Sequence, residues 1–216
     1  MKSADFDNLR ERMVQRQLVA RGVRDSRVLA AMSSVRRHDF VDARNQPAAY
    51  DDRPLPIGFG QTISQPYIVA WMTELLQVGP QDCVLEIGTG CGYQTAVLAR
   101  LARHVYSIER IAELSQQAAL NLARAGVTNV TLEVGDGYEG WPEHAPYPCI
   151  ISAAAPSDVP EALTRQLDPG GRLVLPVGGR GFQGMVRVTK QPDGSLKREY
   201  LGTVAFVPLV HGVERE

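Results

Sequence analysis

The chain has 216 residues, 44% of them apolar, which is enough for one substantial hydrophobic core and makes a single domain over 1–216 the default expectation. Lysine and arginine total 23 against 24 aspartates and glutamates, and this balance argues against a protein whose main partner is nucleic acid. The segment Met1–Leu9 lacks the apolar stretch of a signal peptide, and no segment is long enough to span a bilayer, so no membrane partner is expected.

The cysteines indicate a reducing compartment. Cys83, Cys91 and Cys149 are odd in number and lack the spacing of metal ligands, and the four histidines are scattered, so no metal site is indicated. Buried, reduced thiols are the favoured interpretation, and they predict a cytoplasmic protein.

The first third of the chain is predicted to form helices followed by a long loop. Apolar residues at near-helical intervals predict a helix over 5–21 that Gly22 ends. Asp25 is placed to cap a second helix that runs through Val35. Residues 44–65 are rich in proline and glycine, and an irregular stretch of that length predicts a functional loop.

Eight arginines fall within the first forty residues. Acidic residues are interleaved with them, so solvated helix faces are the favoured interpretation over a binding patch. The eight are Arg10, Arg12, Arg16, Arg21, Arg24, Arg27, Arg36 and Arg37.

The rest of the chain alternates strands and helices before it ends in a hairpin. Helices are predicted after Pro66 and over 92–103, 111–125 and 158–167. Strands are predicted over 83–87, 104–109, 129–134, 149–154 and 172–177, with an antiparallel pair at Met185–Lys190 and Lys197–Pro208. The expected fold is a doubly wound, mostly parallel α/β sheet of the Rossmann-like kind, with N-terminal helices and an antiparallel C-terminal hairpin.

The run Val84–Gly92 (VLEIGTGCG) is the most informative motif. An apolar strand ends in an acidic residue, and glycines at alternate positions then allow a tight turn and a close approach to a ligand. The next strand ends at Glu109, at a spacing where a carboxylate can accept both hydroxyls of a ribose. Gly88, Glu109 and Asp136 all fall at the carboxyl ends of strands, which predicts a site for an adenosine-containing cofactor.

The glycine spacing distinguishes between such cofactors. A G-x-G-x-x-G dinucleotide loop needs its third glycine at position 93, which is Tyr93, whereas the third glycine here is Gly92. The observed E-x-G-x-G-x-G pattern is that of S-adenosylmethionine-dependent methyltransferases, whose cofactor carries no phosphates. Glu86 is then expected to face the cationic methionine end of S-adenosylmethionine, directly or through water.

Segments around this motif resemble one methyltransferase family. Ala49–Gly58 (AYDDRPLPIG) followed by Gly60–Pro66 (GQTISQP) is similar to the signature of protein-L-isoaspartate O-methyltransferases. Further similar segments are Val84–Ala99, Gly135–Gly137, Leu173–Gly178 and Phe206–Leu209. The similarity runs from about residue 8 to about residue 212. We expect the single domain to consist of N-terminal helices with a substrate loop (1–66), a cofactor-binding core (67–178), and a C-terminal hairpin with a tail (179–216).

The resemblance implies methyl transfer from S-adenosylmethionine to the α-carboxylate of L-isoaspartyl residues in damaged proteins and peptides. The resulting ester then collapses to a succinimide without the enzyme. We expect a monomeric enzyme with Ser64 as its active-site residue. The cofactor-binding positions are expected to be Gln61, Thr62, Ile63, Ser64, Glu86, Gly88, Thr89, Gly90, Glu109, Arg110, Gly135, Asp136 and Gly137.

Two roles for Ser64 follow from its position. From the residues alone, a cap for the helix after Pro66 is favoured. The resemblance instead favours a hydrogen-bond donor that aligns the substrate carboxylate, which is already an anionic nucleophile because carboxyl pKa values lie near 4. Departures from the family pattern at Cys91, Pro148 and Ala205 bear on substrate contacts.

Three other functions remain as alternatives. The fold and cofactor would also suit a methyltransferase that modifies one aspartate of a peptide natural product. A non-catalytic cofactor-binding protein is disfavoured by the intact Ser64 and glycine motif, and a nicotinamide oxidoreductase by Tyr93.

Overall fold

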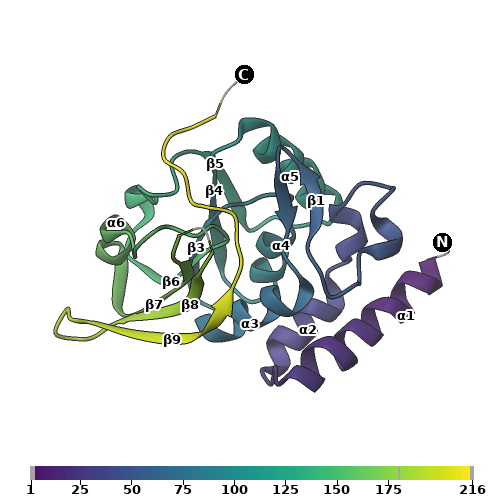
Figure 1. Cartoon of the computed structure of the whole chain (residues 1–216), viewed down its shortest axis with the longest axis horizontal. Helices are drawn as coiled ribbons and strands as arrows, with labels where there is room; N and C mark the ends of the chain where they lie inside the picture. Colours follow the sequence, from purple (N-terminus) through teal and green to yellow (C-terminus); the bar gives the residue numbers. More distant parts are fainter. Residues whose placement is uncertain (1–2, 180, 215–216) are drawn as a thin grey trace.

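A seven-stranded sheet forms the centre of the computed structural model, which describes residues 3–179 and 181–214 (Figure 1). Its strands lie in the order β5-β4-β3-β6-β7-β8-β9. The first five strands in this order are parallel to one another, and β8 and β9 are antiparallel to their neighbours. The mostly parallel sheet with a C-terminal hairpin is thereby confirmed. The strands are β3 (Cys83–Ile87), β4 (His104–Glu109), β5 (Val130–Val134), β6 (Tyr147–Ser152), β7 (Leu167–Val177), β8 (Gln183–Lys190) and β9 (Leu196–Val204).

Helices cover both faces of the sheet, as Figure 1 shows. Consecutive residues of β3 enter different core clusters: Val84 lies with the helix residues Leu76 and Leu98, and Leu85 lies with Leu163 of another helix. None of the helices within the described residues is long and apolar enough to cross a bilayer. The helices are α1 (Ser3–Met13), α2 (Ser26–Ser34), α3 (Pro66–Leu76), α4 (Tyr93–Ala99), α5 (Ala112–Arg124) and α6 (Glu161–Arg165).

The helix predicted over 5–21 is divided into three helical segments. After α1, a π-helical turn spans Val14–Leu18 and a 3-10 turn spans Val19–Arg21, which ends at Gly22 with φ 98°. The buried residues Met13 and Leu18 are five positions apart, more than one α-helical turn. Val14 between them is buried as well, so the π-helical turn lies against the core.

The loop predicted over 44–65 contains a small antiparallel sheet of β1 (Leu55–Gly58) and β2 (Gln61–Ile63). The prolines that argued against strands are tolerated because each strand has only one partner. All three residues at the tip, 58–60, have positive φ, including Phe59 at 51°. The prediction of an irregular segment was therefore wrong for the β1–β2 hairpin.

Smaller differences concern where elements begin and end. The helices predicted over 92–103 and 158–167 are shorter, as α4 and α6, while β7 begins before the Pro169–Gly171 segment that was predicted as a turn. Pro148 is the second residue of β6, where the pairing with β7 shifts register between Tyr147 and Cys149. A residue without an N–H is accommodated there because regular pairing has not begun.

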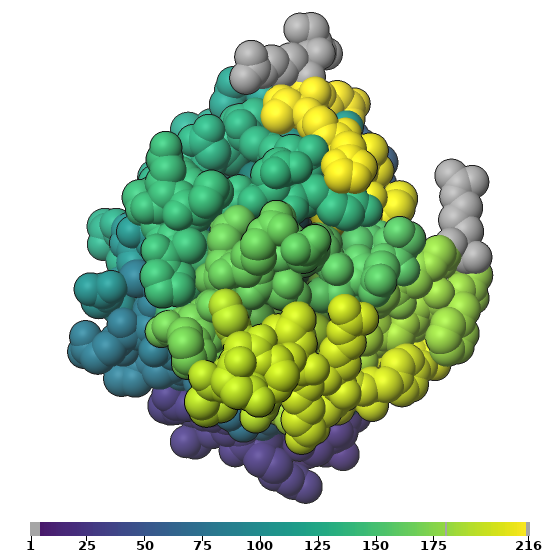
Figure 2. All heavy atoms as spheres, turned by 90° about the vertical axis from the view of Figure 1, so that its left-hand side faces the viewer, coloured from purple at the N-terminus to yellow at the C-terminus, as the bar shows by residue number. Residues whose placement is uncertain are grey.

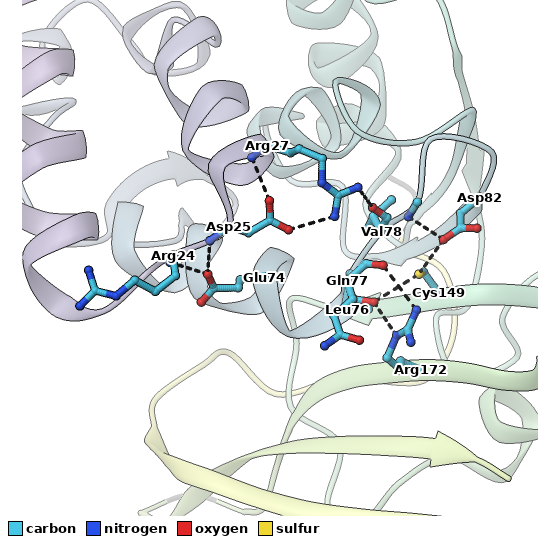
Figure 3. Close-up of polar contacts among 11 residues, drawn as sticks. Arg24, Asp25, Arg27, Glu74, Leu76, Gln77, Val78, Asp82, Cys149 and Arg172 are labelled. Atoms are coloured by element: carbon cyan, nitrogen blue, oxygen red, sulfur yellow. Dashed lines mark hydrogen bonds and ion pairs between the residues drawn. The ribbon is translucent and has the colours of Figure 1, made fainter.

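Polar contacts anchor the N-terminal helices beside the start of β3 (Figure 3). The Oε1 atom of Glu74 accepts hydrogen bonds from the backbone N–H groups of Arg24 and Asp25, both at 2.6 Å. Asp25 caps α2 as predicted, because its Oδ1 accepts the N–H of Arg27 at 2.8 Å. The Arg27 guanidinium in turn donates to the carbonyl of Val78 at 2.8 Å.

The strand β9 forms one edge of the seven-stranded sheet. Lys197 and Arg198 near its start are exposed and charged, and Glu199 pairs with Arg187 of β8 at 2.9 Å and with Lys197 at 3.2 Å. The pairing of β8 with β9 also shifts register between Met185 and Val186. This edge is therefore both charged and irregular.

Candidate functional site

Three adjoining cavities lie at the carboxyl ends of β3 and β6. The chain runs from β3 to β4 on one side, while β6 pairs with β3 on the other, so this is the switch point at which open α/β sheets bind ligands. We name them after a lining residue: the Glu109 cavity, the Glu86 cavity and the Phe206 cavity, of about 210, 40 and 320 Å³. Thr62 and Ala153 line all three.

The carboxylate of Glu109 is fixed across the glycine loop. Its Oε2 accepts the N–H of Gly90 at 2.9 Å, and its Oε1 accepts the N–H of Ile111 at 3.1 Å. Each oxygen keeps a further acceptor position that can face the cavity. The predicted site residues that line the Glu109 cavity are Gln61, Thr62, Gly88, Gly90, Glu109, Arg110 and Gly137.

Glu86 is fully buried on β3 and lines the cavity that we named after it. Its Oε2 accepts hydrogen bonds from the hydroxyls of Thr95 at 2.6 Å and Ser107 at 2.7 Å, whereas its Oε1 has no hydrogen-bond partner in the part of the chain that the structure describes. Burial raises the pKa of Glu86 to about 7, against the opposing effect of the two hydroxyls. An unpaired, buried carboxylate oxygen beside a cavity favours a ligand that brings a cationic N–H donor.

Ser64 lies where the Glu86 cavity meets the Phe206 cavity, and it lines both. Its hydroxyl makes no hydrogen bond with any residue that the structure describes. The N-cap of α3 is Gln65, with no side-chain capping bond, so the structure does not support the role of helix cap for Ser64. The hydroxyl is free to contact a ligand. Ile63 and Thr89, two further predicted site residues, also line the Glu86 cavity.

At two positions of the site, neighbouring side chains lie so close to the backbone that a Cβ would crowd them. Gly90 has φ 55°, and a Cβ there would lie 3.3 Å from Cδ1 of Ile57 on the β1–β2 hairpin. A Cβ on Gly137 would lie 2.4 Å from Cγ2 of Ile87 and 3.2 Å from Cδ1 of Leu209. A side chain at Gly137 would therefore displace the strand residue or the tail beside the Glu109 cavity.

The C-terminal tail forms one wall of the Glu109 cavity, which the sequence did not predict. Val207–Val210 line the cavity, and the tail is joined to Ala155 by two hydrogen bonds of 2.8 Å, one from the Ala155 N–H to Val207 and one from the Leu209 N–H. Figure 2 shows this segment in yellow across the upper end of the molecule. The only signal in the sequence was the resemblance of Phe206–Leu209 to the family pattern.

Asp136 and Gly135 line none of the three cavities. Asp136 instead holds the tail: its Oδ2 accepts the N–H of Gly212 at 2.7 Å and lies 3.4 Å from Nδ1 of His211. Burial alone would raise the pKa of Asp136, but the hydrogen bonds from Gly212 and Tyr138 outweigh it and lower the pKa. Its contribution to the site is therefore indirect.

The Phe206 cavity is an open groove beside Ser64. Gln183 fixes one wall, because its amide group bonds both the N–H of Phe206 at 2.6 Å and the carbonyl of Phe206 at 3.0 Å. Of the three departures from the family pattern, Ala205 lines this groove, Cys91 lines the Glu86 cavity, and Pro148 lines none of the three.

Comparison with known sequences gives one consistent result. The profile of the family described as protein-L-isoaspartate(D-aspartate) O-methyltransferase (PCMT) matches residues 8–214. A protein-L-isoaspartate O-methyltransferase of Synechococcus sp. is 52% identical over 215 residues, covering 96% of this chain and 88% of that protein. One from Methanoculleus marisnigri is 54% identical over 201 residues, covering 93% and 91%.

Two solved structures are similar along nearly the whole chain. A protein-L-isoaspartate O-methyltransferase superposes with a TM-score of 0.86 at 30% identity, covering 94% of this chain and 67% of the other. A Plasmodium falciparum structure, reported as a candidate enzyme of the same kind in complex with S-adenosyl-L-homocysteine, superposes with a TM-score of 0.81 at 25% identity, covering 95% and 98%.

Proposed function

This chain belongs to the protein-L-isoaspartate O-methyltransferase family, and we propose on that premise that it methylates the α-carboxylate of L-isoaspartyl residues in damaged proteins and peptides, with S-adenosylmethionine as methyl donor. The chain is a methyltransferase with the Rossmann-like fold of that family. The single observation that supports the reaction most directly is the unpaired hydroxyl of Ser64 between the Glu86 cavity and the Phe206 cavity.

S-adenosylmethionine is proposed to occupy the Glu109 and Glu86 cavities together. Glu109 would accept the ribose hydroxyls, and the unpaired Oε1 of Glu86 would accept the ammonium group of the methionine part. When bound, this cofactor supplies a methyl group on a sulfonium, which needs no further activation. The remaining proposed contacts are Gln61, Thr62, Ile63, Gly88, Thr89, Gly90, Arg110 and Gly137, with Gly135 and Asp136 as indirect supports.

The chain's own contribution is proposed to be orientation. The isoaspartyl carboxylate is anionic at neutral pH, so no group has to remove a proton from it. Ser64 would donate a hydrogen bond that directs one carboxylate oxygen toward the methyl group, while the groove of the Phe206 cavity holds the peptide main chain. Positioning of this kind can lower a barrier by roughly 7–11 kcal/mol.

An isoaspartyl linkage fits such a groove for a geometric reason. It adds a methylene to the main chain and leaves the α-carboxylate as a short branch. A normal aspartate side chain is displaced by that methylene when the main chain is docked on both sides. Because misplacement by about 1 Å can reduce a rate on the order of a hundredfold, discrimination needs no difference in charge.

The proposal is tested with pairs of peptides that differ only in aspartyl or isoaspartyl linkage. We expect transfer of labelled methyl groups to the isoaspartyl member of each pair and almost none to the aspartyl member. Equal methylation of both would leave the fold and the cofactor in place but would refute the repair function. Methylation restricted to one peptide sequence would favour the alternative of a dedicated peptide-maturation enzyme.

We also propose that the chain acts as a monomer in the cytoplasm without a nucleic-acid partner. The balanced charge and the three unpaired cysteines support this. Light scattering of the purified protein tests the oligomeric state.

A further inference from the structure

Arg37 is the one arginine of the N-terminal eight that is fully buried, contrary to the expectation of solvated helix faces. It begins the 3-10 turn η3 (Arg37–Phe40), and its Nε donates to the carbonyl of Ala49 at 2.7 Å. Among the described residues, its other two nitrogens, Nη1 and Nη2, make no hydrogen bond of regular geometry, although the Tyr93 side chain interacts with the guanidinium, and none forms an ion pair with it. Arg37 is therefore a buried cation without a counter-ion among the described residues.

The groups that face Arg37 do not neutralise it. Its guanidinium carbon lies 4.8 Å from the ring centre of Tyr93, and Cys91 and Tyr50 also interact with its charge. Burial raises the pKa of Tyr93 to about 12 and that of Cys91 to about 11, and it raises the pKa of Tyr50 as well, so all three are uncharged at neutral pH. The aromatic face of Tyr93 is therefore the main compensation for the charge.

The position of this charge connects it to the site. Tyr93 and Cys91 both line the Glu86 cavity, so one layer of side chains separates the guanidinium from that cavity. An atom in contact with Tyr93 would lie within roughly 10 Å of the guanidinium carbon. Glu86 lines the same cavity and Glu109 lines the adjoining one, and both carboxyl groups stay in place when Arg37 is replaced, so a comparison of the unchanged protein with a variant isolates the charge of Arg37.

We propose that Arg37 is a specificity-determining residue of the methyl-transfer site, whose unpaired positive charge disfavours the sulfonium form of the cofactor relative to the demethylated form. This rests on the proposed function, because it takes the Glu86 cavity to hold the sulfur end of the cofactor. The repulsion between Arg37 and the sulfonium ends when the methyl group leaves, and the same charge attracts an anionic substrate carboxylate.

The test compares the affinities of S-adenosylmethionine and S-adenosylhomocysteine by calorimetry. The two ligands differ by one methyl group and one charge, so packing lost in a variant weakens both alike, while their affinity ratio reports the charge. We expect Arg37→Met to shift the ratio toward S-adenosylmethionine on the order of tenfold, the effect of one charge at this distance with an effective dielectric constant of about 20. Arg36→Met, the same change at an exposed neighbour, should leave the ratio as it is in the unchanged protein.

Arg37→Lys supplies a second test that keeps the charge and size at this position. A buried lysine loses its proton more readily than arginine. Glu86, whose pKa is about 7, titrates beside this cavity in both proteins, so the variant is compared with the unchanged protein at each pH. The two ratios should match at pH 6, and by pH 9 the ratio of the variant should lie further toward S-adenosylmethionine than that of the unchanged protein. This measurement decides the matter if Arg37→Met does not fold.

An unchanged ratio in Arg37→Met, or in Arg37→Lys at high pH, would overturn the inference while leaving the proposed function intact. Failure of the unchanged protein to bind either ligand would instead refute the proposed cofactor site. The two failures are therefore distinguishable.

Discussion

Ser64 lines two cavities, and its hydroxyl has no hydrogen-bond partner among the described residues. Removal of this hydroxyl is therefore expected to cause a defined kinetic defect. Ser64→Ala should lower kcat on the order of 10- to 100-fold, because a hydrogen bond to a charged group contributes about 1.5–3 kcal/mol. Affinity for S-adenosylhomocysteine and the melting temperature should change little. Full turnover together with a lower melting temperature would instead assign Ser64 to the stability of α3.

Glu109 is bonded to the glycine loop and is proposed to bind the ribose. Glu109→Ala should weaken the binding of S-adenosylhomocysteine by about 1.5–3 kcal/mol, measured by calorimetry. An analogue lacking the ribose hydroxyls should bind the variant and the unchanged protein with similar affinity. If the analogue also loses affinity in the variant, Glu109 acts through the N–H of Gly90 rather than through the ribose.

Glu86 predicts a dependence of stability on pH. Because burial raises its pKa from 4.5 to about 7, the folded state retains a proton that the unfolded state has lost between these values. The stabilisation is complete below about pH 4.5 and is lost as the pH rises through 7, with a change on the order of 3 kcal/mol. Urea unfolding at pH 5.5 and 8 should show this fall in the unchanged protein and a smaller one in Glu86→Gln.

Individual residues differ in how far the sequence could predict them. Glu86 and Glu109 followed from strand ends and glycine spacing, because these positions are local in the chain. The burial of Arg37 depends on contacts with Ala49 and Tyr93, which lie 12 and 56 positions away (49 − 37 and 93 − 37). Nothing in its own arginine-rich segment distinguishes it from its exposed neighbours.

Among the elements, the attachment of α2 to α3 through Glu74 is the contact with the clearest expected effect on stability. Glu74→Ala would leave two backbone N–H groups at the start of α2 without their acceptor. We expect a loss of about 1–3 kcal/mol, which corresponds to a melting temperature lower by roughly 2–10 °C. The exposed Glu143→Ala serves as the control, and methyl transfer below the melting temperature should be retained in both.

The elements that the sequence predicted well have strong periodicity and clear ends. β3 and β4 match their predicted ranges residue for residue, because each is a mostly buried strand with clear ends: β3 is followed at once by the glycine loop, and β4 ends at Glu109. The β1–β2 hairpin was missed because its prolines and glycines are typical of loops, and its pairing is decided by contacts beyond the segment. The π-helical turn was missed because helical periodicity in the sequence does not distinguish a π-helical turn from an α-helical one.

At the scale of the whole molecule, the tail connects the end of the chain to the cofactor cavity. Deletion from His211 onward removes the contacts of Gly212 with Asp136 and of Glu214 with Arg110, the latter at 2.6 Å. S-adenosylhomocysteine should then dissociate severalfold faster in stopped-flow experiments, with little change in association. An unchanged dissociation rate would show that residues 207–210 close the cavity unaided.

The whole fold was predictable because strand and helix patterns alternate and the motif residues fall at strand ends. The expectation of a doubly wound sheet with a C-terminal hairpin holds for all seven strands of the main sheet. The path of the tail was predicted wrongly: the second strand of the hairpin was expected to run through Pro208, but β9 ends at Val204, and the position of the following tail depends on a bridge to Ala155.

The charged, irregular edge at β9 affects how this enzyme can interact with extended polypeptide chains. Open sheet edges are templates on which other extended chains aggregate, and lysines and register breaks oppose this. We expect damaged polypeptide substrates to present such extended segments. Because Lys197, Arg198 and Glu199 lie along β9, this edge should resist pairing with the extended segments of substrates that bind in the groove. The enzyme should therefore not aggregate with its substrates through this edge.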